Sequence, residues 1–92
     1  MRIEVSEIRF HAATPADVER GLLGWTSFVL NGVVLIDGVT LRRSVENRPF
    51  LSFPERRVSG RRKHFYVRPL NDRARRDIEY QVLKALNLEV TP

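Results

Sequence analysis

Arginines crowd around one short turn of this chain, and they are the residues best suited to chemistry. Five cations flank positions 58–60 on both sides: Arg56, Arg57, Arg61, Arg62 and Lys63. A guanidinium group can grip a phosphate through two parallel hydrogen bonds and can stack on a base, whereas a lysine is a hydrated point charge. Crowding these charges creates repulsion that a phosphate backbone would relieve. The pattern predicts a phosphate-binding loop, and the alternative is a solvated loop without a ligand.

A second basic surface is predicted on the last segment of the chain, which has the pattern of a helix. Four residues recur there at steps of three and four: Arg73, Arg76, Tyr80 and Lys84. A basic stripe with an aromatic ring can enter a groove or stack on bases, and it is equally typical of an exposed helix side. Arg42 and Arg43 end a predicted strand on opposite faces, and we take Arg42 as the one that joins the basic loop. The predicted nucleic-acid-binding residues are therefore Arg42, Arg56, Arg57, Arg61, Arg62, Lys63, Arg73, Arg76 and Lys84.

The distribution of charge agrees with a polyanionic partner. From Arg42 to Lys84 there are 13 basic and five acidic residues, a local net charge of +8. The remaining residues include three basic and six acidic ones, so they are net negative. An arginine-rich half on a small domain is typical of proteins that bind nucleic acid. The alternative is a solubilising surface in an organism with arginine-rich proteins.

Signals for catalysis are weak. The chain has no cysteine, which excludes disulfides, thiolate metal sites and cysteine nucleophiles. His11 and His64 fall in different predicted strands without a carboxylate at a ligand spacing, and Asp37 has no acidic partner. No phosphate-binding glycine motif occurs. We therefore predict a non-enzymatic protein with no catalytic residue, metal, cofactor or small-molecule substrate, and a small hydrolase is the weakest option.

The elements that must position these cations fit into one small domain covering residues 1–92. With 92 residues and 10.7 kDa the hydrophobic core is thin, and a partner subunit would help to complete it. No apolar run approaches the roughly 18–20 residues that span a bilayer. The segment from Met1 to Glu7 lacks the apolar stretch of a signal peptide. We expect a cytoplasmic protein without a membrane partner.

A central β-hairpin is the strongest structural prediction. Two β-rich runs flank Asn31-Gly32, a dipeptide that favours a two-residue type I′ turn because both residues must take positive φ. That turn would place Leu30 opposite Val33 and Trp25 opposite Gly38. We expect Gly38 to form a bulge within one long strand that reaches Leu41.

The other elements follow from alternation and from turn residues. The first strand covers Ile3 to Phe10 with an irregularity near Ser6, and a polar connection runs from Ala12 to Arg20. The expected order after the hairpin is a strand from Pro49 to Phe53, a basic loop from Pro54 to Arg62, a strand from Lys63 to Arg68, and a helix capped by Asn71. On this helix we predict ion pairs of Arg73 with Asp77 and of Arg75 with Glu79. Its predicted apolar stripe consists of Ala74, Ile78, Val82, Ala85 and Leu86. These patterns predict an α+β fold: a small antiparallel β-sheet of about five strands with a long central hairpin and one C-terminal helix.

The ordered set of segments resembles the stage V sporulation protein G (SpoVG, or septation protein) family. Phe50-Leu51-Ser52-Phe53-Pro54 with Arg56 is similar to its F-V-A-M-P-S-K segment, and Val34 to Leu41 is similar to its V-I-H-D-L-R-V-I strand. Arg68-Pro69-Leu70-Asn71 resembles H-P-I-N, and Ile3 to Arg9 resembles K-I-T-D-V-R. The chain departs from the family at Ile36, where the family has histidine, and in its arginine-rich loop, where the family has T-P-D-G-E.

The resemblance implies a strand-mediated homodimer and a bacterial cytoplasmic regulator that binds DNA or RNA. It links the protein to septation, cell division or sporulation-type programmes. It carries nucleic-acid contact to Arg73, Arg76 and Lys84, with Arg56 matching the basic residue after the proline. The alternative function is a protein-interaction module that docks on an acidic partner of the division machinery, because a cationic surface and free strand edges serve both roles.

Overall fold

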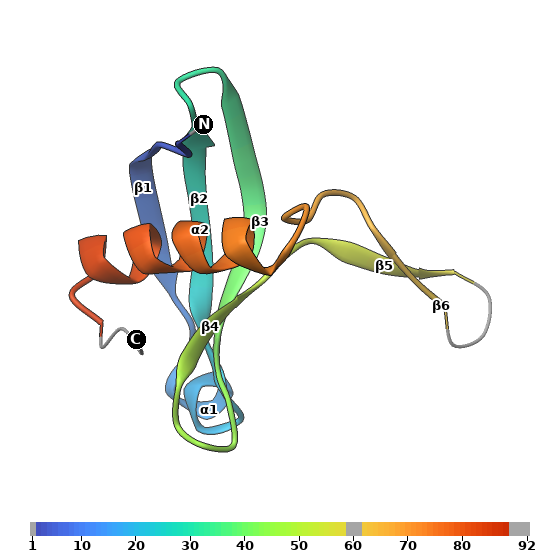
Figure 1. Cartoon of the computed structure of the whole chain (residues 1–92). Coiled ribbons are helices and arrows are strands. Elements are labelled where there is room, and N and C mark those ends of the chain that lie inside the picture. Colours follow the sequence, from blue (N-terminus) through green and yellow to red (C-terminus); the bar gives the residue numbers. More distant parts are fainter. Residues whose placement is uncertain (1, 59–61, 89–92) are drawn as a thin grey trace.

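An antiparallel sheet crossed by one long helix forms the body of the protein, and a two-stranded arm extends from it (Figure 1). The computed structural model describes residues 2–58 and 62–88. In chain order the elements are β1 (Val5–Ala12), α1 (Pro15–Glu19), β2 (Leu22–Leu30), β3 (Val34–Arg43), β4 (Pro49–Ser52), β5 (Glu55–Val58), β6 (Arg62–Phe65) and α2 (Asp72–Ala85). The main sheet has the order β1-β2-β3-β4, and β5 pairs with β6 alone. The predicted α+β class is confirmed, with six described strands where about five were expected.

The central hairpin forms where it was predicted, but its register differs by one residue. Asn31 and Gly32 both have positive φ, at 51° and 69°, as the predicted turn requires. However, Leu30 pairs with Val34 rather than Val33, so the connection has three residues. The observed register places Phe28 opposite Ile36, and both side chains are buried. A one-residue slip would turn one of this pair to the other face, so burial in the core selects the register.

Two predicted irregularities of the strands are confirmed. The register of β1 and β2 shifts between Ser6 and Arg9, where Glu7 has a φ of 48°. On β3 an extra residue stands between Ile36 and Val39, and Gly38 has a φ of 71°. This bulge lets Ile36, Val39 and the following Leu41 all face the core, although strict alternation would turn Val39 outward.

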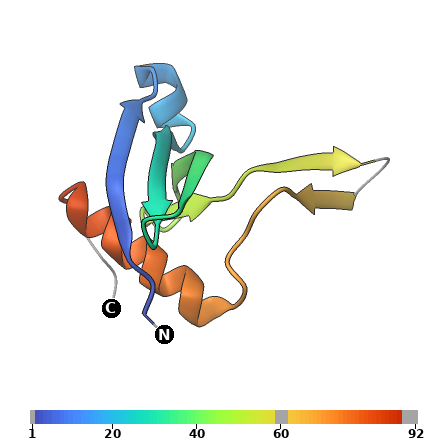
Figure 2. The ribbon, with the colours of Figure 1, turned by 90° about the horizontal axis from the view of Figure 1, so that it is seen from above.

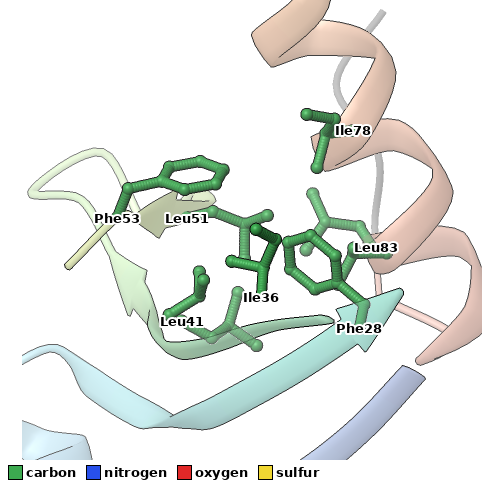
Figure 3. Close-up of a cluster of buried hydrophobic side chains, with 9 residues drawn as sticks. Phe28, Ile36, Leu41, Leu51, Phe53, Ile78 and Leu83 are labelled. Carbon is green, nitrogen blue, oxygen red and sulfur yellow. The ribbon is translucent and has the colours of Figure 1, made fainter. Parts of the chain in front are cut away.

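The core lies between the sheet and α2. Figure 3 shows Phe28, Ile36, Leu41 and Leu51 on the sheet pointing toward the helix. On α2 the buried residues are Ile78, Val82 and Leu83. The predicted cap is present, because the Asn71 side chain accepts a hydrogen bond from the backbone amide of Ala74 at 2.9 Å. Among the residues predicted for the apolar stripe of this helix, Ala85 is wrong, since it is exposed.

One side chain of α2 holds the β1 edge of the sheet. Gln81 accepts a hydrogen bond from the Val5 amide at 3.0 Å and donates one to the Ile3 carbonyl at 2.8 Å. It also donates to the Asp77 carboxylate at 2.9 Å, which fixes its orientation. The amide thus satisfies two backbone groups that an additional strand would otherwise satisfy.

Replacing Gln81 by leucine should destabilise the protein by about 1–3 kcal/mol, because both partly buried backbone groups lose their partner. Urea unfolding followed by circular dichroism measures this change. The same substitution at the exposed Arg76 is the control and should stay within about 0.5 kcal/mol. Equal midpoints for the two variants would show that the contact at the edge contributes nothing.

A second pair of helix side chains covers the opposite edge of the sheet. The Leu51 amide on β4 donates to the Glu79 carboxylate at 2.9 Å, and Arg75 donates to the Leu51 carbonyl at 3.0 Å. Arg75 and Glu79 also form the predicted ion pair, at 3.6 Å. The backbone of β4 at Leu51 is therefore occupied and cannot accept another strand.

The basic segment expected as a loop is largely a strand, which corrects the prediction for Pro54 to Arg62. Residues 55–58 form β5 and residues 62–65 form β6, antiparallel to each other. Within the described residues these two strands pair only with each other, and Phe65 at the base of β6 packs against the hydrophobic core. Figures 1 and 2 show the resulting arm, defined here as β5 and β6, extending away from the sheet and α2. The sequence did not predict this strand, because the segment is mostly charged and lacks apolar alternation. A two-stranded ribbon that is exposed to solvent does not need that alternation.

The polar connection from Ala12 to Arg20 also contains an element that was not predicted. Its residues 15–19 form α1, and Thr14 caps this helix by accepting a hydrogen bond from the Asp17 amide at 3.3 Å. Arg43 at the end of β3 donates to the Val18 carbonyl at 2.8 Å and ties α1 to the end of the sheet. The short helix closes the lower end of the body in Figure 1.

Candidate nucleic-acid interface

The side of α2 that faces away from the sheet carries the predicted basic stripe. Arg73, Arg76 and Lys84 are exposed, and the Tyr80 side chain between them is 48% exposed. The Lys84 ammonium lies 5.5 Å from the centre of the Tyr80 ring and 3.5 Å from its hydroxyl. We call these four residues the helix stripe. Their spacing of three and four residues places them along one line, as the sequence predicted.

The cations of the helix stripe are free of acidic partners in the part of the chain that the structure describes. The predicted pair between Arg73 and Asp77 does not form, because Asp77 accepts a hydrogen bond from Gln81 instead. The neighbouring Arg75 differs, since it is paired with Glu79 and hydrogen-bonded to the edge of β4. Arg75 therefore has a structural role, whereas Arg73 and Arg76 remain available to a ligand.

The arm carries the other predicted group. Arg56 on β5 is exposed and stands opposite His64 on β6. The register also places Arg57 opposite Lys63, and Arg62 opposite Val58. Arg61 lies outside the described residues. Four of the five predicted loop cations thus belong to a two-stranded ribbon.

A hollow of about 450 Å³ lies where the arm joins the start of α2. Its lining includes Arg68 and Arg75, together with the acidic residues Glu55 and Asp72. The Arg68 guanidinium lies 5.4 Å from the centre of the Phe65 ring, at the base of the arm. Arg68 was not among the predicted binding residues. Its position three residues after Phe65, at the end of a basic strand, is the signal that could have identified it.

Arg42 does not join the arm or the helix stripe. It is exposed on β3 and pairs with Phe50 on β4. Its neighbour Leu41 is completely buried toward α2, so alternation along the strand directs Arg42 to the opposite face of the sheet. Arg42 therefore lies on the face of the sheet opposite to the helix stripe.

The structure thus divides the predicted site residues among three surfaces. The arm and the helix stripe are joined by the short connection 66–71, and Figure 1 shows α2 beginning near the base of the arm. These two surfaces can contact one extended polyanion, because phosphates repeat along a nucleic acid strand. Arg42 lies on the third surface, the face of the sheet that α2 does not cover.

The described residues form neither a candidate metal site nor a membrane-spanning helix. In residues 2–58 and 62–88 no group of three or more His, Cys, Asp or Glu side chains is placed to hold a metal ion. Within the same ranges, α1 and α2 are both too short and too polar to cross a membrane. No protein-family model matches this chain, and no curated protein matches it.

Proposed function

We propose that the protein is a non-enzymatic regulator that binds DNA or RNA through the arm and the helix stripe. One observation carries the proposal. Arg73 and Arg76 are exposed on α2 and have no ion pair among the described residues, whereas Arg75 beside them is paired and hydrogen-bonded to the sheet. Exposed guanidinium groups on a convex helix side are suited to phosphates.

Phosphate contacts supply most of the affinity in this proposal. Each phosphate that a cation neutralises on duplex DNA adds about 0.9 to the slope of affinity against salt concentration. Tyr80 adds a ring that can stack on an unpaired base or pack on a sugar. Because the helix stripe offers few side chains that read base edges, binding should depend weakly on sequence.

We further propose a bacterial cytoplasmic role like that of the SpoVG family, in septation, cell division or sporulation-type regulation. The support is the ordered resemblance of four segments, from Ile3 to Asn71. The antiparallel sheet with a C-terminal helix is also the fold that this resemblance implies.

The same proposal includes a homodimer formed through strand edges. An isolated two-stranded ribbon is only marginally stable in water, and within the described residues the arm pairs with no other strand and meets the core only through Phe65 at its base. Pairing of two arms would use backbone groups and leave arginine side chains available. Light scattering at micromolar concentration should give about twice the 10.7 kDa of one chain, and a mass of one chain would contradict the dimer.

An electrophoretic shift assay separates nucleic-acid binding from docking on an acidic protein. Random-sequence duplex DNA, single-stranded DNA and RNA are each titrated at physiological salt. A shift by any of these polymers supports the proposal. The absence of any shift at micromolar protein would contradict it and favour the acidic partner of the division machinery.

A further inference from the structure

The face of the sheet opposite α2 carries exposed aromatic and cationic side chains that the basic arm and helix stripe do not use. Strand register places one set of residues on this surface, which we call the outer sheet face: Ser6, Arg9, His11, Leu22, Trp25, Ser27, Val29, Leu35, Thr40, Arg42, Phe50 and Ser52. Among the described elements, α2 packs on the other face, and α1 lies at the end of the sheet, where it contacts β2 and Arg43 of β3. The outer sheet face is therefore open.

Trp25 lies in the middle of this face. It is on β2, an interior strand, between His11 on β1 and Thr40 on β3. Its side chain is nevertheless 42% exposed, because both neighbours are polar and no helix covers it. A large ring left open to water on an interior strand is informative, since such rings are usually covered.

Cations flank this ring on both sides. Arg9 lies on β1, two residues before His11, and Arg42 lies on β3 opposite the half-buried Phe50 of β4. Neither Arg9 nor Arg42 forms an ion pair among the described residues. Arg9, His11 and Trp25 also line a hollow of about 400 Å³ that extends to the bulge at Asp37.

The acidic group at that bulge is already engaged. The Asp37 carboxylate accepts a hydrogen bond from the backbone amide of Gly38 at 2.9 Å, within the bulge itself. Within the described residues Asp37 forms an ion pair with neither Arg9 nor Arg42, so the outer sheet face combines a stacking surface with two cations that have no acidic partner.

We propose that the outer sheet face binds single-stranded nucleic acid, with one base stacked on Trp25 and phosphates held by Arg9 and Arg42. This inference rests on the proposed function, which makes nucleic acid the ligand. It adds a further binding site and specifies that the nucleic acid bound there is single-stranded. The bases of a duplex are stacked on each other and cannot lie on a ring set into a sheet. Unpaired bases can, and aromatic rings flanked by cations bind them without sequence preference.

Charge argues against a second copy of the chain as the occupant. A two-fold interface places the same surface on both subunits. Packing two outer sheet faces together would bring Arg9 and Arg42 of each copy against those of the other. Such like-charge contacts are unfavourable, whereas a phosphate backbone supplies the complementary charge.

The fluorescence of Trp25 provides a direct test, since it is the only tryptophan in the chain. The wild-type protein is titrated at 50 mM salt with 12-nucleotide oligo(dT), oligo(rU) and a duplex of the same length. We expect single strands to quench the fluorescence and the duplex to bind without quenching. Anisotropy of labelled oligonucleotides then measures variants. Trp25→Ala should weaken single-strand binding roughly 5- to 150-fold and leave duplex binding unchanged.

Three further variants sharpen the result. Trp25→Phe keeps a ring and should retain most of the affinity for single strands. Arg9→Glu with Arg42→Glu should weaken single-strand binding without removing the ring. Tyr66→Ala, an exposed aromatic outside this face at 66% exposure, should change nothing.

The failures of the two proposals are distinguishable. Single strands that bind without quenching, with affinity unchanged in Trp25→Ala, would overturn the site while the proposed function stands. If no polymer binds at all, the proposed function fails and the site fails with it. A loss of the dimer in Arg9→Glu with Arg42→Glu, measured by light scattering, would assign the face to a second copy and overturn the inference.

Discussion

Replacing Arg73 and Arg76 together by glutamate is expected to weaken duplex DNA binding by about 100-fold at 100 mM salt. Each of these exposed arginines is proposed to contact a phosphate. A hydrogen bond to a charged group contributes about 1.5–3 kcal/mol, so two lost contacts remove about 3 kcal/mol, or two powers of ten. The slope of affinity against salt should also become shallower by about 2. Fluorescence anisotropy with a labelled 20-base-pair duplex measures both changes.

A matched variant separates local contact from net charge. Arg20→Glu with Arg48→Glu changes the charge by the same amount on exposed residues at the end of α1 and in the turn before β4. This control should reduce affinity far less than the helix variant. Equal losses in the two variants would mean that only overall charge matters and that the helix stripe is not the binding surface. Circular dichroism checks that each variant is folded.

Replacing Phe28 by alanine should largely unfold the protein at growth temperature. Phe28 is completely buried and is opposed by Ile36 at the centre of the core (Figure 3). Truncation of a buried phenylalanine costs about 3–5 kcal/mol, whereas small domains have only about 5–15 kcal/mol of total stability. We expect the melting temperature to fall by more than about 12 °C, as measured by thermal circular dichroism.

Leu35 is the matched control, because it lies on the adjacent strand but points to the outer sheet face and is 64% exposed. Leu35→Ala should change the free energy of unfolding by no more than about 0.5 kcal/mol. A loss of stability as large as that of Phe28→Ala would indicate that the outer sheet face is a second core surface. It would also contradict the assignment of that face to a ligand.

Local patterns predicted much of the fold because their causes are local. The positive φ of Asn31 and Gly32, the bulge at Gly38 and the cap at Asn71 each depend on the conformational preference of one or two residues. The apolar stripe of α2 follows from helical periodicity, and Ile78 and Val82 are buried as expected.

The register of the hairpin could not be predicted from its turn, because packing decides it. A two-residue connection would pair Trp25 with Gly38, but Trp25 stands opposite Thr40. The observed register buries Phe28 against Ile36, and it follows from contacts with α2 that lie far away in the sequence. This difference also explains why the outer sheet face was missed: its composition is known only once the register and the covered face are known.

The candidate site was predicted in composition and only partly in arrangement. The helix stripe follows directly from periodicity, so Arg73, Arg76 and Lys84 lie where the sequence placed them. The arm was expected to be a loop, because a run of charged residues does not show the apolar alternation from which strands are predicted. The structural role of Arg75 was likewise hidden, since it depends on the Leu51 backbone of a distant strand.

The salt dependence of duplex binding tests the central claim most directly. Affinity for a labelled duplex is measured by anisotropy between 50 and 300 mM salt. Five phosphate contacts from the arm and the helix stripe would give a slope of about −4.5 in a plot of log affinity against log salt concentration. A slope between about −4 and −6 supports the account. Binding that is absent at 50 mM salt, or a slope shallower than about −1, would contradict it.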